Sequence, residues 1–474
     1  MLAKTASLLV AASVVAIPSL ATTTPTIQTI SKDVVIVGGG AAGAYAAVRV
    51  REDYGKSIAL IERESHLGGA VDTWTDPKTG VPYELGVEAF LDYGNATKFF
   101  SRFNVSVHVS EQESVNTQYA DFSTGHWVNY TVPTAAERLA AFQKYAKLAE
   151  QYEDMMLPGL WDFPTADKIP EDLLLNFGDF ARKYGIEAAV PTIWDVAAVG
   201  LGNLETQPTF YVMQSFPAPL ARVYTGKGRT LYVASHRNQD IYDRVSDLLG
   251  DDVFYSNVVV RALRTSNGVS VIAKGTDGRQ TEIHAKRLLI AIPPTVSNLA
   301  PFNLDKKELN ILSKTTYTRA YAGGVVSSNL PSNTTIINSA LSGNWLNFPD
   351  LSFLQWYKAL NSPAHYHKVM MFGNETVDSD GSRGLVEQSY QQLVNAGTLL
   401  KEGGEGLEWL HFADHGAVNV RACLKDLKAG FIQELYSLQG HLSTWYTGAA
   451  WSAQLHTPTW AFSDSVIPRL VEGL

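Results

Sequence analysis

The stretch Asp33-Val-Val-Ile-Val-Gly-Gly-Gly-Ala-Ala-Gly43 decides how this chain folds. Its apolar, β-branched run is typical of a buried parallel strand, and small residues at helical spacing follow the glycines. Gly38 permits the turn out of the strand, Gly40 lets the backbone approach a pyrophosphate, and Gly43 allows close helix–strand packing. The spacing predicts a dinucleotide-binding βαβ unit whose helix N-terminus binds phosphate. The expected contacts are Gly38, Gly39, Gly40, Ala41, Ala42 and Gly43.

A second apolar strand, over residues 57–61, ends at Glu62. An acid about 20 residues beyond the last glycine is placed to accept hydrogen bonds from ribose hydroxyls. Because a carboxylate repels a 2′-phosphate, Glu62 argues against NADP. We include its neighbour Arg63 in the expected cofactor site.

A glycine pair, Gly68-Gly69, lies just past the second strand. It resembles the second fingerprint of the FAD-containing amine oxidase superfamily, in which the chain passes under the flavin diphosphate. That superfamily usually has an arginine after the pair, and this chain has Ala70. The resemblance implies FAD, and the absence of a cysteine or histidine beside the expected ring predicts that it is bound without a covalent bond.

The first 21 residues predict a cleaved signal peptide, since a basic start, a short apolar core and small residues precede residue 22. The apolar run is too short to span a membrane. Residues 22–31 read as a polar linker. Secretory-pathway localisation would make five sequons available for glycosylation: Asn95, Asn104, Asn129, Asn333 and Asn374. A net charge of −9 argues against a nucleic-acid partner, and the single cysteine, Cys423, excludes an intrachain disulfide.

The expected fold class is α/β: a two-dinucleotide-binding, Rossmann-like FAD domain with an inserted α+β substrate domain, as in amine oxidases. We assign residues 32–94, 225–299 and 436–474 to the FAD domain, and 95–224 and 300–435 to the substrate domain. A capping box at Thr134 predicts a long helix through Met156.

Residues 226–294 are expected to continue the FAD domain. The glycine turn at Gly226 resembles the one that starts the third helix of the family. Four short strands are expected from Val253 to Pro294, with turns at 266–268, 277–278 and 285–287. Val259 resembles the residue whose backbone meets the adenine.

The segment from Ser443 to Ser452 resembles the last strand of the family, which meets the ribityl chain of the flavin. The resemblance implies cofactor contacts at Gly448 and in a helix beginning at about Ala461 and Phe462. It also implies that Trp445 lies against the flavin face. The usual acid of this motif is replaced by Ala450.

The Gly-Gly-Gly start at 38–40 and the Leu-Gly-Gly run at 67–69 without a following arginine resemble the fungal β-cyclopiazonate dehydrogenase family, secretory flavoproteins of secondary-metabolite pathways. The resemblance implies an oxidoreductase that removes hydride from a bulky apolar natural product, leading to dehydrogenation or ring closure. With a single dinucleotide fingerprint, molecular oxygen is the expected electron acceptor. The lysine that amine oxidases place near flavin N5 is absent from 319–324. Candidate bases are Glu88, Tyr321 and His415.

Two other enzyme classes remain open. One is a flavin amine or amino-acid oxidase, which Ala70, Ala450 and the missing lysine disfavour. The other is a redox-neutral FAD-dependent isomerase of polyunsaturated lipids. His411 and His415 have the spacing of two metal ligands on one helical face, but no glutamate completes a zinc motif, so no metal is expected.

Overall fold

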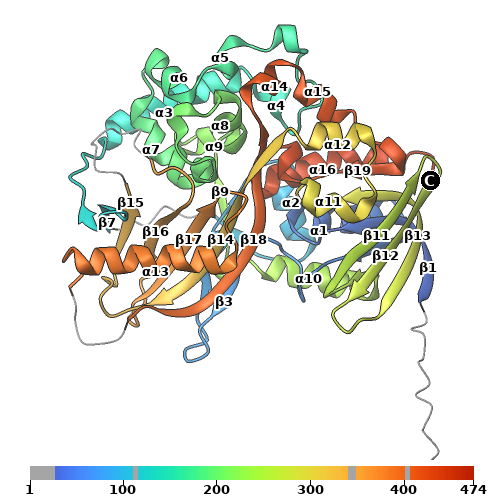
Figure 1. Cartoon of the computed structure of the whole chain (residues 1–474), viewed down its shortest axis with the longest axis horizontal. Coiled ribbons are helices and arrows are strands. Elements are labelled where there is room, and N and C mark those ends of the chain that lie inside the picture. Colours follow the sequence, from blue (N-terminus) through green and yellow to red (C-terminus); the bar gives the residue numbers. More distant parts are fainter. Residues whose placement is uncertain (1–26, 110–115, 340–347, 401–405) are drawn as a thin grey trace, which may run out of the picture.

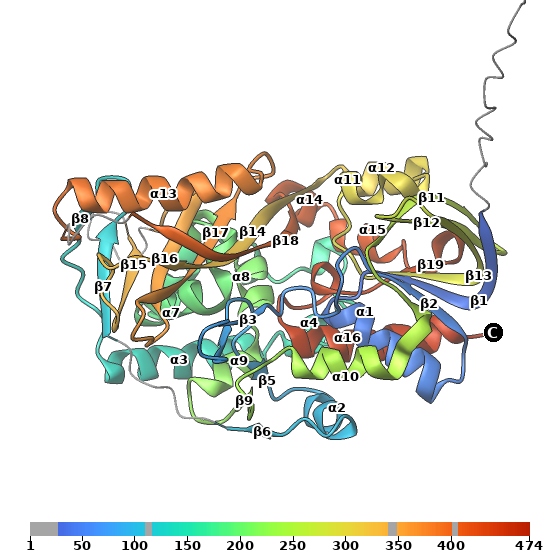
Figure 2. The same cartoon turned by 90° about the horizontal axis from the view of Figure 1, so that it is seen from below.

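The computed structural model describes residues 27–109, 116–339, 348–400 and 406–474; the predicted signal peptide lies outside these. Two lobes lie side by side, each built on a seven-stranded sheet (Figure 1 and Figure 2). The lobe that carries the glycine-rich stretch is the cofactor lobe, and the other is the substrate lobe.

The cofactor lobe has the strand order β10-β2-β1-β13-β12-β11, and β19 pairs with the C-terminal end of β13. The bounds are β1 Gln28–Val37, β2 Ile58–Ile61, β10 Val253–Phe254, β11 Asn257–Thr265, β12 Gly268–Gly275, β13 Gln280–Ile290 and β19 Thr444–Tyr446. The expected polar linker is partly wrong, because β1 already begins at Gln28. Its backbone pairs there with Thr281, so a polar end of the strand is held by the sheet.

The turn predicted at 285–287 is also wrong, because β13 runs through it without a break. Ala285 pairs with Lys32 of β1 on one side and with Val269 of β12 on the other. Two charged side chains made this stretch resemble a turn. Lys286 instead reaches Asp33 across the sheet surface, with Nζ 2.9 Å from the carboxylate.

The glycine turn at Gly226 leads into a strand, β9 (Thr230–Val233), and not directly into a helix. This strand pairs with β5 (Phe90–Leu91) and β6 (Val107–His108) in a small sheet. Helix α10 (Asp240–Leu249) follows later. Because β9 finds partners far away in the sequence, local glycine spacing could not reveal it.

The substrate lobe has the strand order β18-β14-β17-β16-β15-β7-β8. The bounds are β7 Asn116–Asp121, β8 His126–Trp127, β14 Thr315–Val326, β15 Thr334–Asn338, β16 Phe353–Ala359, β17 Tyr366–Gly373 and β18 Glu408–Ala422. Helix α13 (Ser379–Asn395) covers one face of the sheet, where Tyr357 Oη donates to the carbonyl of Val386. The helices between residues 135 and 223 lie on the other side (Figure 2).

The predicted capping box is confirmed at Thr134, whose hydroxyl accepts from the N–H of Glu137. Helix α3 (Ala135–Glu150) is shorter than expected, since the chain turns before α4 (Glu153–Met156).

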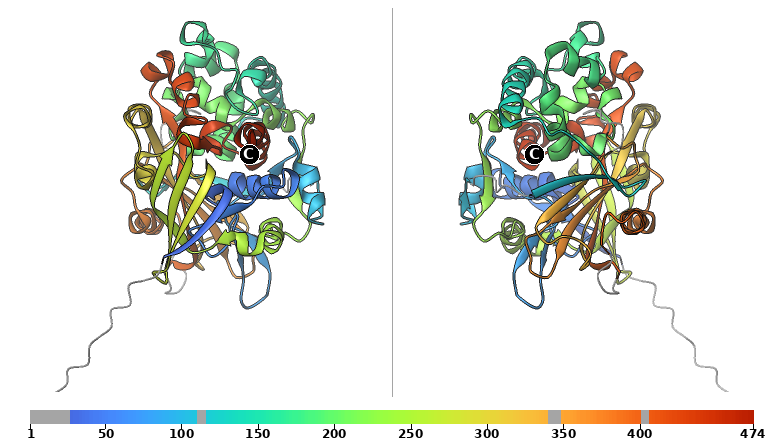
Figure 3. Two further views of the ribbon diagram at one scale, coloured as in Figure 1. Left: turned by 90° about the vertical axis from the view of Figure 1, so that its right-hand side faces the viewer. Right: turned by 90° about the vertical axis from the view of Figure 1, so that its left-hand side faces the viewer.

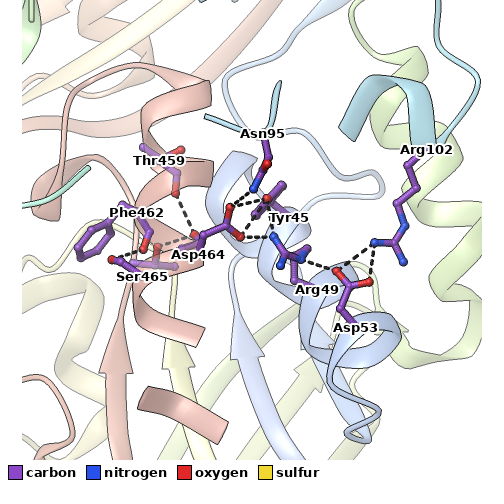
Figure 4. Close-up of polar contacts among 11 residues, drawn as sticks. Tyr45, Arg49, Asp53, Asn95, Arg102, Thr459, Phe462, Asp464 and Ser465 are labelled. Carbon is purple, nitrogen blue, oxygen red and sulfur yellow. Dashed lines mark hydrogen bonds and ion pairs between the residues drawn. The ribbon is translucent and has the colours of Figure 1, made fainter. Parts of the chain in front are cut away.

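Helix α1 (Ala41–Val48) is fixed in place by helix α16 (His456–Val471), which lies beside it (Figure 3). The carboxylate of Asp464 accepts from Tyr45 Oη at 2.9 Å and from Asn95 Nδ2 at 2.7 Å, and it pairs with Arg49 (Figure 4). The glycine-rich helix therefore depends on a segment more than 400 residues later.

Candidate active site

The two glycine loops form one continuous backbone surface. The N–H of Gly68 donates to the carbonyl of Gly39 at 3.0 Å. A Cβ on Gly69 would lie 2.9 Å from the Cα of Gly40, closer than side chains tolerate. Gly69 is needed because the two backbones meet here with no room for a side chain on that residue.

Glu62 holds the end of this surface. Gly39 donates its N–H to Glu62 Oε2 at 2.5 Å, and Glu64 donates to Oε1 at 2.8 Å. The carboxylate is buried but still lines the adjoining cavity. Its position fits the ribose-binding acid that the sequence predicts.

A cavity of about 570 Å³ lies over the glycine loops, within the range of ligand-binding pockets. Its walls come from both lobes, because β18 of the substrate lobe closes the side opposite the glycines. The predicted cofactor residues that line it are Gly38, Gly40, Glu62, Arg63, Gly69, Ala70 and Val259. Gly39, Ala41, Ala42, Gly43 and Gly68 support these residues from the same loops without lining the cavity.

Several buried polar atoms where the two lobes meet have no hydrogen-bond partner among the described residues. Asp72 Oδ2 and His415 Nε2 belong to residues that line the cavity. His456 Nε2 and Thr457 Oγ1 lie in the first turn of α16. Since buried polar groups are nearly always paired, these atoms fit a polar ligand. The glycine surface and Glu62, which line the cavity, are the groups that would hold FAD.

Positive charge reaches the cavity from two arginines, although Ala70 replaces the usual one. Arg63 donates to the carbonyl of Asp414 at 3.0 Å, and Arg319 pairs with the carboxylate of Asp414 at 2.9 Å. Both arginines line the cavity. Arg319 belongs to β14, so sequence spacing around the glycine pair could not have revealed it.

The C-terminal helix begins earlier than predicted. It starts at His456, and Pro458 fits its first turn because the N–H that proline lacks would have no intrahelical partner there. Ala461 therefore lies a full turn inside the helix beside Gly94, and the buried Phe462 stacks on Trp161. The structure does not bring these two residues to the cavity. Gly448 lies beside α1: a Cβ added to this glycine would be 4.0 Å from the Cβ of Ala42.

The structure does not place Trp445 on the cavity wall. The backbone of Trp445 pairs with Leu289 within the sheet, and the guanidinium of Arg287 lies 5.4 Å from the centroid of the indole ring. The cavity starts beyond the end of β13, at Ala291 and Ile292, so Trp445 comes too early along its strand.

Two predicted bases are engaged elsewhere. Tyr321 Oη donates to the carbonyl of Val377 at 2.7 Å, and burial raises the pKa of this tyrosine. Glu88 pairs with Lys358 at 2.6 Å and Lys368 at 2.9 Å. Burial alone would raise the pKa of Glu88, but the two lysines outweigh it and hold the pKa well below its usual range. Neither group is suited to accept a proton.

His415, the third predicted base, does line the cavity. The pairing of β18 with β14 shifts here, since Ala320 faces Gly416 while Tyr321 faces Asp414. A bulge of this kind redirects a side chain. Burial lowers the pKa of His415 to about 4, so the imidazole is neutral at physiological pH.

The lysine that is absent from 319–324 is not replaced by Lys368 of the adjacent strand, because Lys368 does not line the cavity. Lys368 of β17 is paired in register with Gly324, and its Nζ donates to the carbonyl of Gly86 at 2.6 Å.

His411 and His415 lie on strand β18 and not on a helix, as the metal-ligand spacing would have required. One carboxylate–histidine group among the described residues has metal-like spacing: Asp305, Glu308 and His441. Arg264 forms two bonds of 2.7 Å to Glu308, so Glu308 is one half of a buried ion pair, and His441 pairs separately with Asp305.

Comparison with known proteins agrees with this geometry. Residues 36–103 match the family of NAD(P)-binding Rossmann-like domains. The chain is 31% identical to FAD-dependent oxidoreductase pigF of Monascus ruber, over 94% of this chain and 93% of that one. It is 30% identical to β-cyclopiazonate dehydrogenase of Aspergillus oryzae, over 94% of both chains.

Solved structures share the fold at low identity. A fatty acid isomerase from P. acnes superposes with a TM-score of 0.68 at 18% identity, over 93% of this chain and 99% of that one. A putrescine oxidase mutant superposes with a TM-score of 0.61 at 17% identity, over 94% of this chain and 99% of that one. These confirm the amine oxidase-like, Rossmann-containing fold.

Within the described ranges, no helix combines the length and the apolar character needed to cross a bilayer. The glycine surface, its acid, the two-lobed cavity and the near full-length relatives all point to one class of enzyme that uses FAD. The chain belongs to the family of FAD-dependent oxidoreductases that includes β-cyclopiazonate dehydrogenase.

Proposed function

We propose that this enzyme removes hydride from a bulky, largely apolar intermediate of secondary-metabolite biosynthesis. The product arises by dehydrogenation or by oxidative ring closure, and molecular oxygen takes up the electrons. The observation that carries this proposal is the near full-length similarity to β-cyclopiazonate dehydrogenase. Bound FAD supplies the hydride acceptor, and the chain supplies orientation and exclusion of water.

The departures from amine oxidases favour this substrate class over simple amines. Ala70 and Ala450 stand where that superfamily has arginine and an acid, and residues 319–324 contain no lysine. Release of peroxide on incubation with simple amines or amino acids would support the amine oxidase alternative. The isomerase with the same fold supports a second alternative, a redox-neutral reaction on a polyunsaturated lipid.

Deletion of the gene in the producing organism tests the proposal. We expect a precursor to accumulate that is two hydrogens heavier than the final metabolite. Purified enzyme should convert it without added nicotinamide, with consumption of oxygen. Accumulation of a compound with the same mass as the product would refute the oxidative reaction and favour the isomerase.

We propose that the enzyme enters the secretory pathway after loss of the first 21 residues. Four sequon asparagines are exposed: Asn104, Asn129, Asn333 and Asn374. At Asn95 the amide nitrogen is engaged with Asp464, so we expect no glycan there. Intact Met1 on secreted protein, with no mass change after deglycosylation, would contradict this route.

We also propose that the flavin is held without a covalent bond. Cys423 lies at the N-cap of α14 (Leu424–Lys428), and its thiol contacts Asp426. It does not line the cofactor cavity. Acid precipitation should release all yellow colour, and colour left in the pellet would disprove non-covalent binding.

A further inference from the structure

His411 forms an acid–base pair with Asp72 at the cavity wall. His411 Nε2 lies 2.9 Å from Asp72 Oδ1. The two residues are 339 positions apart and come from different lobes. Asp72 follows the second glycine loop, whereas His411 belongs to strand β18 of the substrate lobe. The pair therefore exists only when the lobes are assembled around the cavity.

The hydrogen bond fixes which nitrogen of His411 is basic. Asp72 accepts the proton on Nε2, so the lone pair of the neutral ring is on Nδ1. Among the described residues, none bonds to Nδ1. The His411 side chain is 34% exposed, and it lines the cavity, so Nδ1 is accessible to a ligand.

On the neighbouring strand β14, His411 is paired with Gly324, and Phe412 is paired with Gly323. Both glycine positions are closely packed, since an added Cβ would meet Leu85 at Gly324 and Trp409 at Gly323. A ligand therefore reaches the imidazole from the cavity that His411 lines. The other basic group at this position, Lys368, is directed toward Gly86 and Glu88.

We propose that His411 is the base that accepts the proton released in dehydrogenation and that Asp72 is its positioning residue. The inference rests on the proposed function. The substrate loses hydride from one carbon to the flavin and a proton from the adjacent O–H, N–H or C–H group to His411 Nδ1. A double bond forms between these two atoms, FAD is reduced by two electrons, and molecular oxygen reoxidises it. The proton on His411 then passes to solvent.

The charges around the pair set its pH dependence. The hydrogen bond to Asp72 raises the pKa of His411, and burial opposes this. The other nearby groups are Glu84 on β4 (Pro82–Glu84), whose pKa burial raises to about 7, Lys368 on β17, and Asp414 and His415 on β18. Since the base acts when unprotonated, flavin reduction should rise with pH through a value above that of an ordinary histidine.

Three variants of the holoenzyme test the proposal. His411→Gln removes the base, Asp72→Asn removes its charged partner, and His441→Gln is the matched control. His441 pairs with Asp305 at 2.7 Å in the cofactor lobe and does not line the cavity. Flavin absorbance reports FAD content in each variant. Anaerobic mixing with the precursor purified from the deletion strain reports the rate of flavin reduction.

We expect His411→Gln to retain FAD and to lose at least about 100-fold in the rate of flavin reduction. Asp72→Asn should shift the rise of the pH–rate profile to lower pH, and His441→Gln should change neither. Histidine-ring NMR gives an independent readout: the pKa of His411 should fall in Asp72→Asn while FAD stays bound.

A His411→Gln enzyme that reduces its flavin at the wild-type rate would overturn the proposal. So would a His411 pKa that is unchanged by Asp72→Asn, a result that does not depend on activity or on recovery of the His411→Gln protein. Failure of the proposed function is recognised separately, because the mass of the accumulated precursor, measured without any variant, reports it.

Discussion

Replacing Gly43 by alanine separates the structural use of the glycine-rich stretch from its use in binding. A Cβ at this position would lie 1.8 Å from the carbonyl oxygen of Gly38 and 3.0 Å from the Cβ of Ala291. The first contact is with backbone, so helix α1 would have to move away from β1 by more than an ångström. Overpacking of this kind costs about 1–3 kcal/mol, and a rigid backbone partner places this variant at the upper end.

Gly40→Ala is the matched comparison. A Cβ there meets only the Cα of Gly69, at 3.6 Å, which is an ordinary contact. The free energy of unfolding should therefore stay close to the wild-type value. The new methyl group would enter the cavity where the phosphates bind, so affinity for FAD should fall at least tenfold, or about 1.4 kcal/mol. The larger Gly40→Val should abolish binding.

Two measurements on each variant decide between these effects. Urea unfolding of flavin-free protein, followed by tryptophan fluorescence, gives stability. Quenching of FAD fluorescence on titration gives affinity. Wild-type stability in the Gly43 variant would refute the packing argument, and full flavin occupancy in Gly40→Val would exclude this loop as the diphosphate site.

Other substitutions test single interactions. Glu62→Ala should weaken FAD binding by about 1–3 kcal/mol, measured by the same fluorescence titration, because the ribose loses a charged acceptor; unchanged affinity would contradict this role. Arg264→Met leaves the buried carboxylate of Glu308 without its charged partner, so the free energy of unfolding should fall by about 3–5 kcal/mol. Hydrogen bonds from Lys286 and Ser57 lower the pKa of Asp33 to about 2, below its ordinary value of 3.8. The ionised Asp33 therefore stabilises the fold above its ordinary pKa of 3.8, and this stabilisation is lost as pH falls through about 2. Asp33→Asn should lower the free energy of unfolding at neutral pH but not near pH 2. Urea unfolding at several pH values measures the difference.

The strand–glycine–helix unit could be predicted from sequence because its causes are local. Apolar β-branched residues, three glycines and an acid at fixed spacing each contribute within about 30 residues, the size of one βαβ unit. The C-terminal helix was misplaced because its first turn has no side-chain cap and contains Pro458. Its real start is determined by packing against α1, which no local pattern records.

The catalytic side of the cavity could be predicted least. Glu88 and Tyr321 have suitable chemistry in the sequence, but the folded chain places lysines beside one and a carbonyl beside the other. The sequence drew attention to His411 only for its spacing from His415, because its partner Asp72 lies in the other lobe. The sequence identifies titratable residues, whereas their roles depend on neighbours that only the tertiary structure brings together.

The dependence of helix α1 on Asp464 has a consequence for synthesis of the chain. The ribosome makes the glycine-rich helix early, but Asp464, which bonds to Tyr45, emerges 419 residues later. Strand β19, which completes the sheet beside β13, is made only shortly before Asp464. The cofactor lobe therefore cannot complete its fold until the last helix has been made, although its first strands are synthesised early.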